Sequence, residues 1–369
     1  MPANPIRVLA VSEIPTPYRL PLYRLLAARP EIELSVVFCA LSEPDRPWQL
    51  DAELEGVRHT VLRGIHPRVR SRRGTFVYEI NPGIVSLLRR ADYDVLVVGG
   101  YAVFATQFSL AYARARGVPY LLHSESHFAK PRAGWKAAVK SAVLPPLFRG
   151  AAGALATGSA AARYLAAYGV DPARIRIFPN TIDVSLYRAQ ADAARARSAE
   201  IRRELRLPER FVLFAGRLVE DKGIGDLVEA LELLGPDAPA LVVAGEGPLA
   251  ADLGDAIRLG FVQRERLIEL LALAEWTAIP SRVEPWGVIV NEALAAGSPL
   301  IVTSAVGAAE DLVVDGVNGR VVGARSPREL ADAIAGPRPS ADPSRGRIEH
   351  WDYAFAIDQF VEAVHLAVA

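Results

Sequence analysis

Two glutamates frame a loop within residues 279–304: Glu284 lies in the loop, and Glu292 lies on the helix predicted after it. This segment reads as an apolar run, a turn, a helix over 287–296 and a second apolar run, which is typical of the βαβ unit of an open parallel sheet. Loops at the carboxyl ends of such strands bind ligands, and a helix N-terminus there presents N–H groups to an anion. We therefore expect one carboxylate to bind sugar hydroxyls and the other ribose hydroxyls, with a phosphate between them.

Two cations, Arg217 and Lys222, follow the run FVLFA, which predicts a strand over 211–215. The chain has 38 Arg and four Lys, and no other Lys follows position 140, so Lys222 stands out as a compact charge. Cations at a strand's carboxyl end can stabilise a diphosphate leaving group as its bond breaks. The alternative is an exposed surface pair.

A glycine-rich turn, Gly245-Glu246-Gly247-Pro248-Leu249-Ala250, follows the predicted strand 240–244. It fits the pattern G-x-G-x-x-A of dinucleotide sites, but that pattern is weak alone. No acidic residue ends a following strand at the expected spacing of about 20 residues. We therefore favour a tight turn and expect no dinucleotide cofactor.

Five polar residues follow the predicted strand 119–124 or end it: His123, Ser124, Glu125, Ser126 and His127. Such a group at a strand's carboxyl end suits binding of a sugar, binding of an acceptor hydroxyl, or proton transfer. A structural role for each histidine is the alternative. By contrast, Asp92 and Asp94 precede the predicted strand 95–100, at the end opposite the ligand loops, and we interpret them as a turn and not as a metal site.

Charge is unevenly distributed although the 369-residue chain has no net charge. Residues 1–185 carry 23 basic and 14 acidic residues, and the remainder carries the opposite excess. Two segments of residues 1–185 are strongly basic. One is 130–149, with a predicted helix over 135–144, and the other is a run of arginines that we interpret as a loop (Arg68, Arg70, Arg72, Arg73). They suit an anionic membrane surface or acceptor, or are ordinary solvated faces. Interleaved aromatic residues are lacking, so nucleic-acid binding is not expected.

Strand and helix patterns alternate along the chain, which predicts parallel sheets covered on both faces. We expect an α/β domain over 1–185, a linker near 179–187, a helix over 193–205, a second α/β domain over 186–349 and a terminal helix within 350–369. One cysteine, Cys39, excludes a disulfide framework within the chain. The first residues predict a strand and not a signal segment, and the longest apolar run is about half a membrane span, so a cytoplasmic location is expected.

Five segments together resemble the retaining, nucleotide-sugar-dependent glycosyltransferases numbered family 4, which have the GT-B fold of two Rossmann-like domains facing a cleft. In chain order they read FAGRLVEDKG, AGEGPL, LGFV, PSRVEPWGVIVNEALAAGSPLIVTS and VVDGVNGRVV. The first domain resembles the family more loosely, through its opening strand, IPTPYRLPLY and LLHSESH.

The resemblance implies that the second domain binds a nucleoside-diphosphate sugar without a metal or other cofactor, and that the terminal helix packs on the first domain. It places Arg217 and Lys222 on the diphosphate, Glu292 on the ribose, Glu284 on the transferred sugar and His123 near that sugar. The remaining donor-binding positions that it implies are Gly216, Gly245, Gly247, Phe261, Val262, Pro285, Trp286, Gly287 and Val288.

The first loop departs from the family pattern. Many members carry a Gly-Gly pair close to the donor phosphates, and here residues 12–19 read SEIPTPYR. Tyr18 or Arg19 can replace that phosphate contact, and Glu13 can face the acceptor instead. We also place Ser124, Glu125 and His127 on the acceptor side.

The family retains configuration, yet no carboxylate in this chain is an evident covalent nucleophile. A front-face displacement, in which a phosphate oxygen takes the acceptor's proton, is therefore expected. The sequence leaves open a nucleotide-sugar epimerase or hydrolase on the same fold, and a non-catalytic sugar-nucleotide-binding protein. The donor's base and sugar, and a glycan, lipid-linked or small-molecule acceptor, also stay open.

Overall fold

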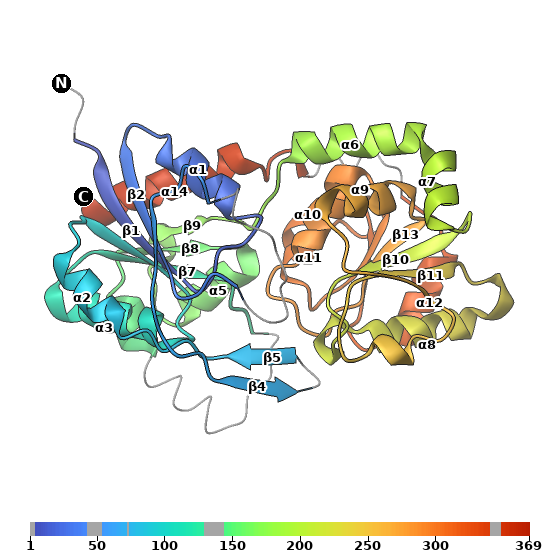
Figure 1. The fold of residues 1–369 in the computed structure, drawn as a ribbon, viewed down its shortest axis with the longest axis horizontal. Coiled ribbons are helices and arrows are strands. Elements are labelled where there is room, and N and C mark those ends of the chain that lie inside the picture. The colour runs from blue at the N-terminus through green and yellow to red at the C-terminus, as the bar shows by residue number, and fades with distance from the viewer. Residues whose placement is uncertain (1–3, 43–53, 72–73, 129–143, 340–347) are drawn as a thin grey trace. The chain divides into compact units, whose positions relative to one another are not determined.

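Two parallel-sheet units make up the chain in the computed structural model, which describes residues 4–42, 54–71, 74–128, 144–339 and 348–369 (Figure 1). The first unit comprises Met1–Arg70, Thr75–Thr181 and Tyr353–Ala369, and the second comprises Ser71–Gly74 and Ile182–Asp352. Residues 135–143 of the predicted basic helix over 135–144 lie outside the described residues. No helix of the described part is both long enough and apolar enough to cross a membrane.

The first unit is built on a parallel sheet of order β3-β2-β1-β6-β7-β8-β9. Its strands are β1 (Ile6–Ser12), β2 (Ile32–Phe38), β3 (His59–Val61), β6 (Val95–Gly99), β7 (Tyr120–Ser124), β8 (Gly153–Ala156) and β9 (Ile175–Ile177). Its helices are α1 (Leu20–Ala27), α2 (Gly83–Arg90), α3 (Phe104–Arg116), α5 (Ser159–Ala167) and α14 (Tyr353–Val368).

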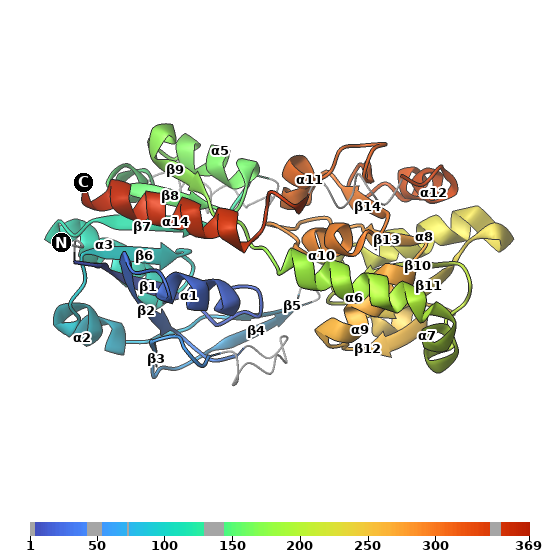
Figure 2. The ribbon, with the colours of Figure 1, turned by 90° about the horizontal axis from the view of Figure 1, so that it is seen from above.

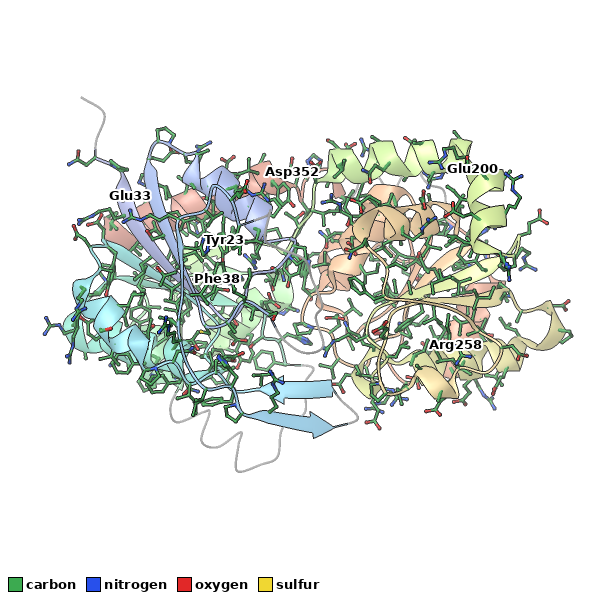
Figure 3. All side chains as sticks on the ribbon, in the orientation of Figure 1. Tyr23, Glu33, Phe38, Glu200, Arg258 and Asp352 are labelled. Atoms are coloured by element: carbon green, nitrogen blue, oxygen red, sulfur yellow. The ribbon has the colours of Figure 1, made fainter. Side chains whose placement is uncertain are left out.

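Both faces of this sheet are covered, as its apolar strands require. Val8 and Ala10 of β1 join the apolar cluster of α1 and α14, whereas Leu9 and Val11 join the cluster of α2, α3 and α5. The terminal helix α14 packs against α1 and against β7 to β9 (Figure 2). On the same face, Tyr23 of α1 lies near Phe38 of β2, with ring centroids 6.4 Å apart (Figure 3).

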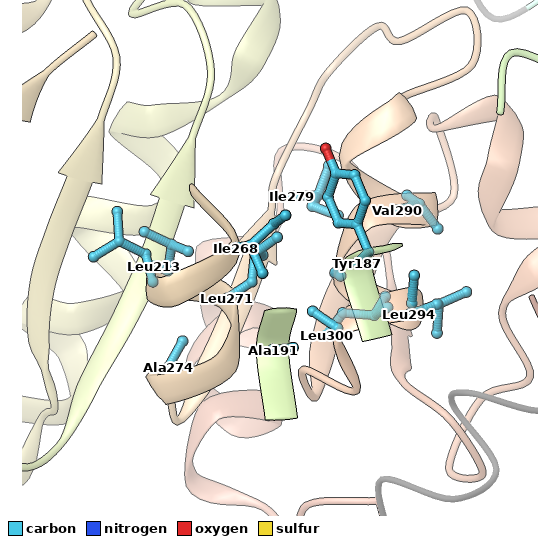
Figure 4. Close-up of a cluster of buried hydrophobic side chains, with 14 of the residues drawn as sticks. Tyr187, Ala191, Leu213, Ile268, Leu271, Ala274, Ile279, Val290, Leu294 and Leu300 are labelled. Atoms are coloured by element: carbon cyan, nitrogen blue, oxygen red, sulfur yellow. The ribbon is translucent and has the colours of Figure 1, made fainter. Parts of the chain in front are cut away.

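The second unit is built on a parallel sheet of order β12-β11-β10-β13-β14-β15. Its strands are β10 (Phe211–Ala215), β11 (Ala240–Ala244), β12 (Ile257–Gly260), β13 (Trp276–Ile279), β14 (Leu300–Thr303) and β15 (Arg320–Val322). Its helices are α6 (Val184–Ala196), α7 (Ser198–Leu205), α8 (Ile224–Leu234), α9 (Arg264–Leu273), α10 (Val288–Ala296), α11 (Gly307–Leu312) and α12 (Pro327–Ala335). Leu213, Ile279 and Leu300 pack with α6, α9 and α10 on one face (Figure 4).

Three local expectations need correction. The predicted linker 179–187 contains the start of α6, because the Asp183 side chain accepts a hydrogen bond from the Leu186 N–H at 2.9 Å and caps the helix at Val184. The single helix predicted over 193–205 is two helices, α6 and α7, joined at Arg197. The arginine run interpreted as a loop begins in strand β4 (Arg68–Ser71), which pairs with β5 (Gly74–Val77).

Candidate functional site

The predicted cations and Glu284 of the second unit lie at the point where its strand order reverses. Arg217 and Lys222 follow β10, and Glu284 follows β13, the strand that pairs directly with β10. The chain continues from β10 to β11 on one side and from β13 to β14 on the other. Open parallel sheets bind ligands outside the carboxyl ends of the strands at such a point.

Glycines allow the loops at this edge to approach one another closely. Gly223 has φ +70°, and a Cβ on it would fall on the carbonyl oxygen of Pro280, in the loop after β13. Gly245 has φ +154°, and a Cβ there would fall on the carbonyl oxygen of Gly216. The glycine-rich turn after β11 is therefore explained by its packing against the loop after β10.

Lys222 and Glu284 form an ion pair in which Nζ donates to Oε2. Their side chains are 24% and 12% exposed. The Glu284 backbone is fixed to the loop after β14, because its N–H donates to Ala305 and its carbonyl accepts from the Gly307 N–H at 3.0 Å. The sequence had assigned these two residues separate roles, and the structure brings them into direct contact. Arg217 is half-buried in the same loop as Lys222.

A second ion pair, which sequence reasoning missed, holds the two loops together. The Arg282 guanidinium donates to both oxygens of Asp226, with Nε at 2.8 Å from Oδ2 and Nη2 at 2.5 Å from Oδ1. The Arg282 N–H also donates to the Asp221 carbonyl at 2.8 Å. This two-pronged contact raises the pKa of Arg282 and fixes the loop after β13 against the first turn of α8.

The loop before α10 offers its backbone to a ligand. Gly287 has φ +92°, and no side chain caps the helix N-terminus that follows it. Trp286 is 2% exposed, its indole N–H donates to Asn291 at 3.0 Å, and its ring stacks on Trp351 with centroids 5.6 Å apart. The Trp286 side chain therefore anchors the predicted loop from Pro285 to Val288, while the N-terminus of α10, which no side chain caps, suits an anion.

Glu292 is held by a tyrosine from α6. The Tyr187 hydroxyl donates to Glu292 Oε1 at 2.6 Å. Burial raises the pKa of Glu292, and the Tyr187 hydrogen bond partly opposes that shift because it favours the charged carboxylate. Tyr187 lies in the segment that the sequence analysis assigned to a linker. The capping residue Asp183, four positions before it, was the signal that would have extended the helix to include it.

At the far edge of this sheet, Phe261 follows β12 and is 39% exposed. Its N–H donates to Glu246 Oε1 at 3.4 Å, which joins the turn after β11 to the end of β12. Val262 is half-buried beside it. An exposed aromatic ring at a strand's carboxyl end is a suitable surface for a planar base.

The predicted polar group of the first unit also lies at a reversal of strand order, between β1 and β6. Glu13 follows β1, and Gly100 follows β6 and donates its N–H to the His123 carbonyl at 2.9 Å. The Arg19 guanidinium, before α1, contacts His123 Nε2 at 2.6 Å and donates to Asn180 Oδ1. Asn180 in turn donates to Glu125 Oε1 at 2.8 Å.

Arg19 and Asn180 are the buried members of this group, with 6% and 2% of their surface exposed. Burial and the charge of Arg19 together lower the pKa of His123 well below its ordinary value, so the ring is neutral at physiological pH. Sequence reasoning missed Asn180, although a buried Asn beside Pro179 is an unusual residue for a linker.

The other predicted acceptor-side residues take different positions. Ser124 is buried, and its hydroxyl accepts from the Ser126 N–H at 3.1 Å, which shapes the turn after β7. The Ser126 hydroxyl lies 2.8 Å from the Tyr101 hydroxyl. Tyr18 and His127 are half-buried.

Asp92 and Asp94 are partners of Arg7, at the amino end of the sheet. Arg7 Nη2 lies 2.6 Å from Asp94 Oδ1 and Nε lies 3.1 Å from Oδ2, and Asp92 forms a further ion pair with the same guanidinium. The hydrogen bonds from Arg7 lower the pKa of Asp94. Within the described ranges, no group of three or more His, Cys, Asp or Glu side chains is placed to hold a metal ion.

Comparison with known proteins gives matches over both units. Residues 197–336 match the family described as glycosyl transferases group 1, and residues 15–181 match the glycosyl transferase 4-like domain. A D-inositol 3-phosphate glycosyltransferase of Mycobacteroides abscessus is 34% identical over 221 residues, which are 55% of this chain and 48% of that protein. A glycogen synthase of Mycobacterium tuberculosis is 31% identical over 187 residues, 47% of this chain and 42% of that protein. The chain thus spans about half the length of the curated relatives it matches.

Solved structures share the whole fold. Anabaena Alr3699/HepE in complex with UDP and glucose has a TM-score of 0.73 at 17% identity, over 98% of this chain and 99% of that one. A sucrose-phosphate synthase of Thermosynechococcus elongatus has a TM-score of 0.70 at 18% identity, over 97% and 98%. Together with the two sheets, these likenesses confirm the predicted fold of two Rossmann-like domains, GT-B. With family matches covering most of both units, the chain belongs to the group 1 glycosyl transferases.

Proposed function

We propose that this protein transfers a sugar from a nucleoside-diphosphate sugar to an acceptor hydroxyl. The observation that carries the proposal is the Lys222–Glu284 ion pair at the strand-order reversal of the second unit, beside the uncapped N-terminus of α10. The pair offers a cation to a diphosphate and a carboxylate to hydroxyl groups within one small area. Membership of the glycosyl transferase family supports the same activity.

Each part of the donor has a matching group in the second unit. Lys222, Arg217 and the N–H groups of α10 bind the diphosphate, and Glu284 accepts hydrogen bonds from the transferred sugar. Glu292, oriented by Tyr187, accepts hydrogen bonds from the ribose hydroxyls. Phe261 lies where a base can pack on its exposed ring. The neighbouring Anabaena structure holds UDP and glucose, which supports a nucleotide sugar as the donor class here.

Transfer with retention of configuration is the reaction that we infer. The acceptor oxygen forms a bond to the anomeric carbon on the face that the diphosphate leaves, and the bond from that carbon to the phosphate oxygen breaks. Its electron pair stays on the diphosphate, and a phosphate oxygen takes the acceptor's proton. Glu284 and Glu292 are both engaged by donors, Lys222 and Tyr187, which favours a binding role for each over that of a covalent nucleophile.

The charge that builds on the leaving diphosphate is stabilised by Arg217, Lys222 and the α10 N-terminus, and the proposed reaction needs no cofactor beyond the donor. Such preorganised groups stabilise the transition state because they are already oriented before charge develops. In the first unit, the His123 and Glu125 cluster supplies hydrogen-bonding groups for the hydroxyls of a sugar or acceptor.

A thermal-shift screen tests the donor class directly. The purified chain is mixed with UDP-, GDP-, ADP- and TDP-sugars, and a bound donor at 100 times its Kd stabilises the fold by about 2.7 kcal/mol. Lys222→Ala is expected to lose the shift, and Arg210→Ala, which breaks an exposed ion pair with Glu275 elsewhere in the unit, is expected to keep it.

The screen and its follow-up also decide between activities. Absence of a shift with every nucleotide sugar would contradict the proposal. Consumption of the donor with no acceptor requirement would indicate an epimerase or hydrolase, and binding without turnover of any acceptor would indicate a sugar-nucleotide-binding protein.

A further inference from the structure

The first unit carries a buried cation whose contacts are unusual. The Arg19 side chain is 7% exposed, yet the nearest carboxylate oxygen, Glu125 Oε1, lies 3.9 Å from Nη2 and belongs to a side chain that is 41% exposed. A buried charge normally requires a close opposite charge or a full set of hydrogen bonds. Arg19 instead depends on neutral groups, namely the His123 ring, the Asn180 amide oxygen and the face of Phe178, 4.6 Å from the guanidinium carbon.

The contact with His123 determines where that ring carries its proton. Arg19 Nη2 lies 2.6 Å from His123 Nε2. A guanidinium has only N–H donors and stays charged in proteins, so Nε2 must be the acceptor. A neutral imidazole that accepts at Nε2 carries its single N–H at Nδ1.

Two further contacts hold His123 in place, one on its ring and one on its backbone. The Phe178 ring packs edge-on against His123, with centroids 5.6 Å apart, and the same Phe178 supports the guanidinium. The His123 carbonyl accepts from the Gly100 N–H at 2.9 Å, which holds the backbone at the end of β7. Arg19 and His123 are therefore held in one orientation from three elements of the first unit.

The strand next to His123 presents no side chain to its Nδ1 at position 99. Position 99, at the end of β6, is glycine, and the Cβ of any larger residue would lie 3.8 Å from His123 Nδ1. Arg19, before α1, is the charged group that acts on the His123 ring, and Tyr23 on α1 and Glu125 after β7 lie within electrostatic range of Arg19 and of each other. Glu13, after β1, lies beside Gly100. Arg19 contacts a ring nitrogen directly, and Glu125 is linked to Arg19 through Asn180.

We propose that Arg19 is a positioning residue, which fixes the neutral, Nδ1-protonated form of His123 so that His123 donates a hydrogen bond to a substrate oxygen and does not act as a general base. This inference rests on the proposed glycosyl transfer only for the identity of that oxygen, a hydroxyl of a sugar or acceptor. It also gives a role to the arginine in the first loop of this chain, since its charge orients a neighbouring residue.

Nitrogen-15 NMR of the histidine side chains tests the tautomer in the full chain without any substrate. The six histidines are labelled, and the His123 signals are assigned by their loss in His123→Asn. We expect wild-type His123 to carry its proton at Nδ1 from about pH 6 to pH 8, across the ordinary histidine pKa of about 6.5. A proton at Nε2, or titration near pH 6.5, would overturn the proposal.

Substitution of Arg19 separates positioning from simple structural support. Arg19→Met removes the donor, so His123 is expected to lose its fixed tautomer and to titrate closer to the ordinary value. Arg19→Lys retains a charged donor and is expected to restore the Nδ1-protonated form. Should Arg19→Met fail to fold, the wild-type and Arg19→Lys spectra still decide the question. A proton at Nδ1 of His123 in both proteins is the expected result, and a proton at Nε2 would contradict the proposal.

Turnover with UDP-, GDP-, ADP- and TDP-glucose provides the functional comparison. Arg19→Met is expected to lower kcat about tenfold or more, on the scale of one hydrogen bond to a charged group, and Arg19→Lys to recover part of that loss. Equal kcat in all three proteins would overturn the positioning role. Wild-type protein that transfers no sugar from any donor would count against the proposed function, whereas the NMR result would still decide the role of Arg19.

Discussion

The two units place a cation at the same topological position but hold it in different ways. In the second unit, Lys222 is paired with the carboxylate of Glu284, and its side chain is 24% exposed. In the first unit, Arg19 is 7% exposed and is bonded to neutral acceptors on His123 and Asn180. Each lies where the strand order reverses, between β10 and β13 in one sheet and between β1 and β6 in the other.

This difference shows how one fold supplies two kinds of chemistry. A partly exposed cation held by a carboxylate can exchange that partner for an incoming anion, because one charged contact replaces another. A buried cation whose close contacts are neutral groups, and whose carboxylate partner Glu125 lies 3.9 Å away, acts on the groups beside it, here by adding to the effect of burial in lowering the pKa of His123. We therefore propose that the second unit binds a charged ligand and that the first unit orients hydrogen-bonding groups.

Substitution of Lys222 is the strongest test of this difference between the two units. We expect Lys222→Ala to lower kcat at least about 100-fold, the usual scale for loss of one group that stabilises a leaving or oxyanion charge. Lys222→Arg is expected to recover only part of the loss, because a planar guanidinium does not replace a compact ammonium. The measurement is steady-state turnover at saturating donor.

Arg210→Ala is the matched control for this variant, since it removes a cation from an exposed ion pair in the same unit. Its kcat is expected to stay at the wild-type value, because such pairs contribute about 0–1 kcal/mol. Near-normal turnover of Lys222→Ala would place Lys222 with these surface cations and remove the contrast between the two units.

The close approach of loops in the second unit gives the next largest effect. Gly223→Ala is expected to destabilise the fold by about 1–3 kcal/mol, because position 223 has φ +70° and a Cβ would collide with the Pro280 carbonyl. Donor binding is expected to weaken with it, since Lys222 and the loop that carries Glu284 are displaced together. Denaturant unfolding and donor titration measure the two effects.

Gly225→Ala, two positions further on, is expected to change stability in the opposite direction. Gly225 is exposed in α8, and its Cβ would meet no atom within 4 Å. Alanine is favoured over glycine within helices by about 0.5–1 kcal/mol, and because Gly225 lies in the first turn of α8 we expect a gain at or below the lower end of that range. Equal effects of the two substitutions would show that loop packing at Gly223 has no special role.

The sequence predicted the features that depend on local patterns. The buried strands, the glycines after β10 and β11 and the cations at the carboxyl end of β10 follow from hydrophobic runs and turn residues, and β10 and β11 have the predicted bounds. The partners of the site residues did not follow, because they come from distant parts of the chain. Tyr187 and Glu292 are 105 residues apart, and Arg19 and Asn180 are 161 apart. Local patterns cannot encode such pairs, which form only when the sheets are assembled.

Tyr187→Phe tests one of those long-range partners. Loss of the 2.6 Å hydrogen bond is expected to raise the donor Kd about tenfold at pH 7, the effect of about 1.4 kcal/mol. The Tyr187 bond lowers the pKa of Glu292, so the variant's Glu292 has a pKa raised further. Since ribose binding needs the carboxylate, donor affinity should be lost at a higher pH on acidification than in the wild type.

Tyr78→Phe serves as the control, because it removes an exposed tyrosine hydrogen bond, to Gln107, in the first unit. Donor titrations of both variants from pH 5 to pH 8 make the comparison. An unchanged Kd and pH profile in Tyr187→Phe would mean that Glu292 does not need its tyrosine.

Glu292→Gln gives the smallest expected effect and tests whether the second unit keeps a buried charge for its ligand. Burial raises the pKa of Glu292, so its stabilising contribution belongs to the protonated form and is lost as pH rises through the raised pKa. Glutamine mimics that neutral form and can still accept from Tyr187. At pH 7.5 we expect Tm to rise by about 2 °C, the shift that corresponds to roughly 0.5–1 kcal/mol in a domain of this size. The gain should shrink at pH 5, where the wild-type carboxyl is closer to its protonated form, and donor affinity should fall at both pH values. A variant that is less stable at pH 7.5 would show instead that the Glu292 carboxylate stabilises the fold of the second unit, just as contacts with neutral groups hold Arg19 in the first unit.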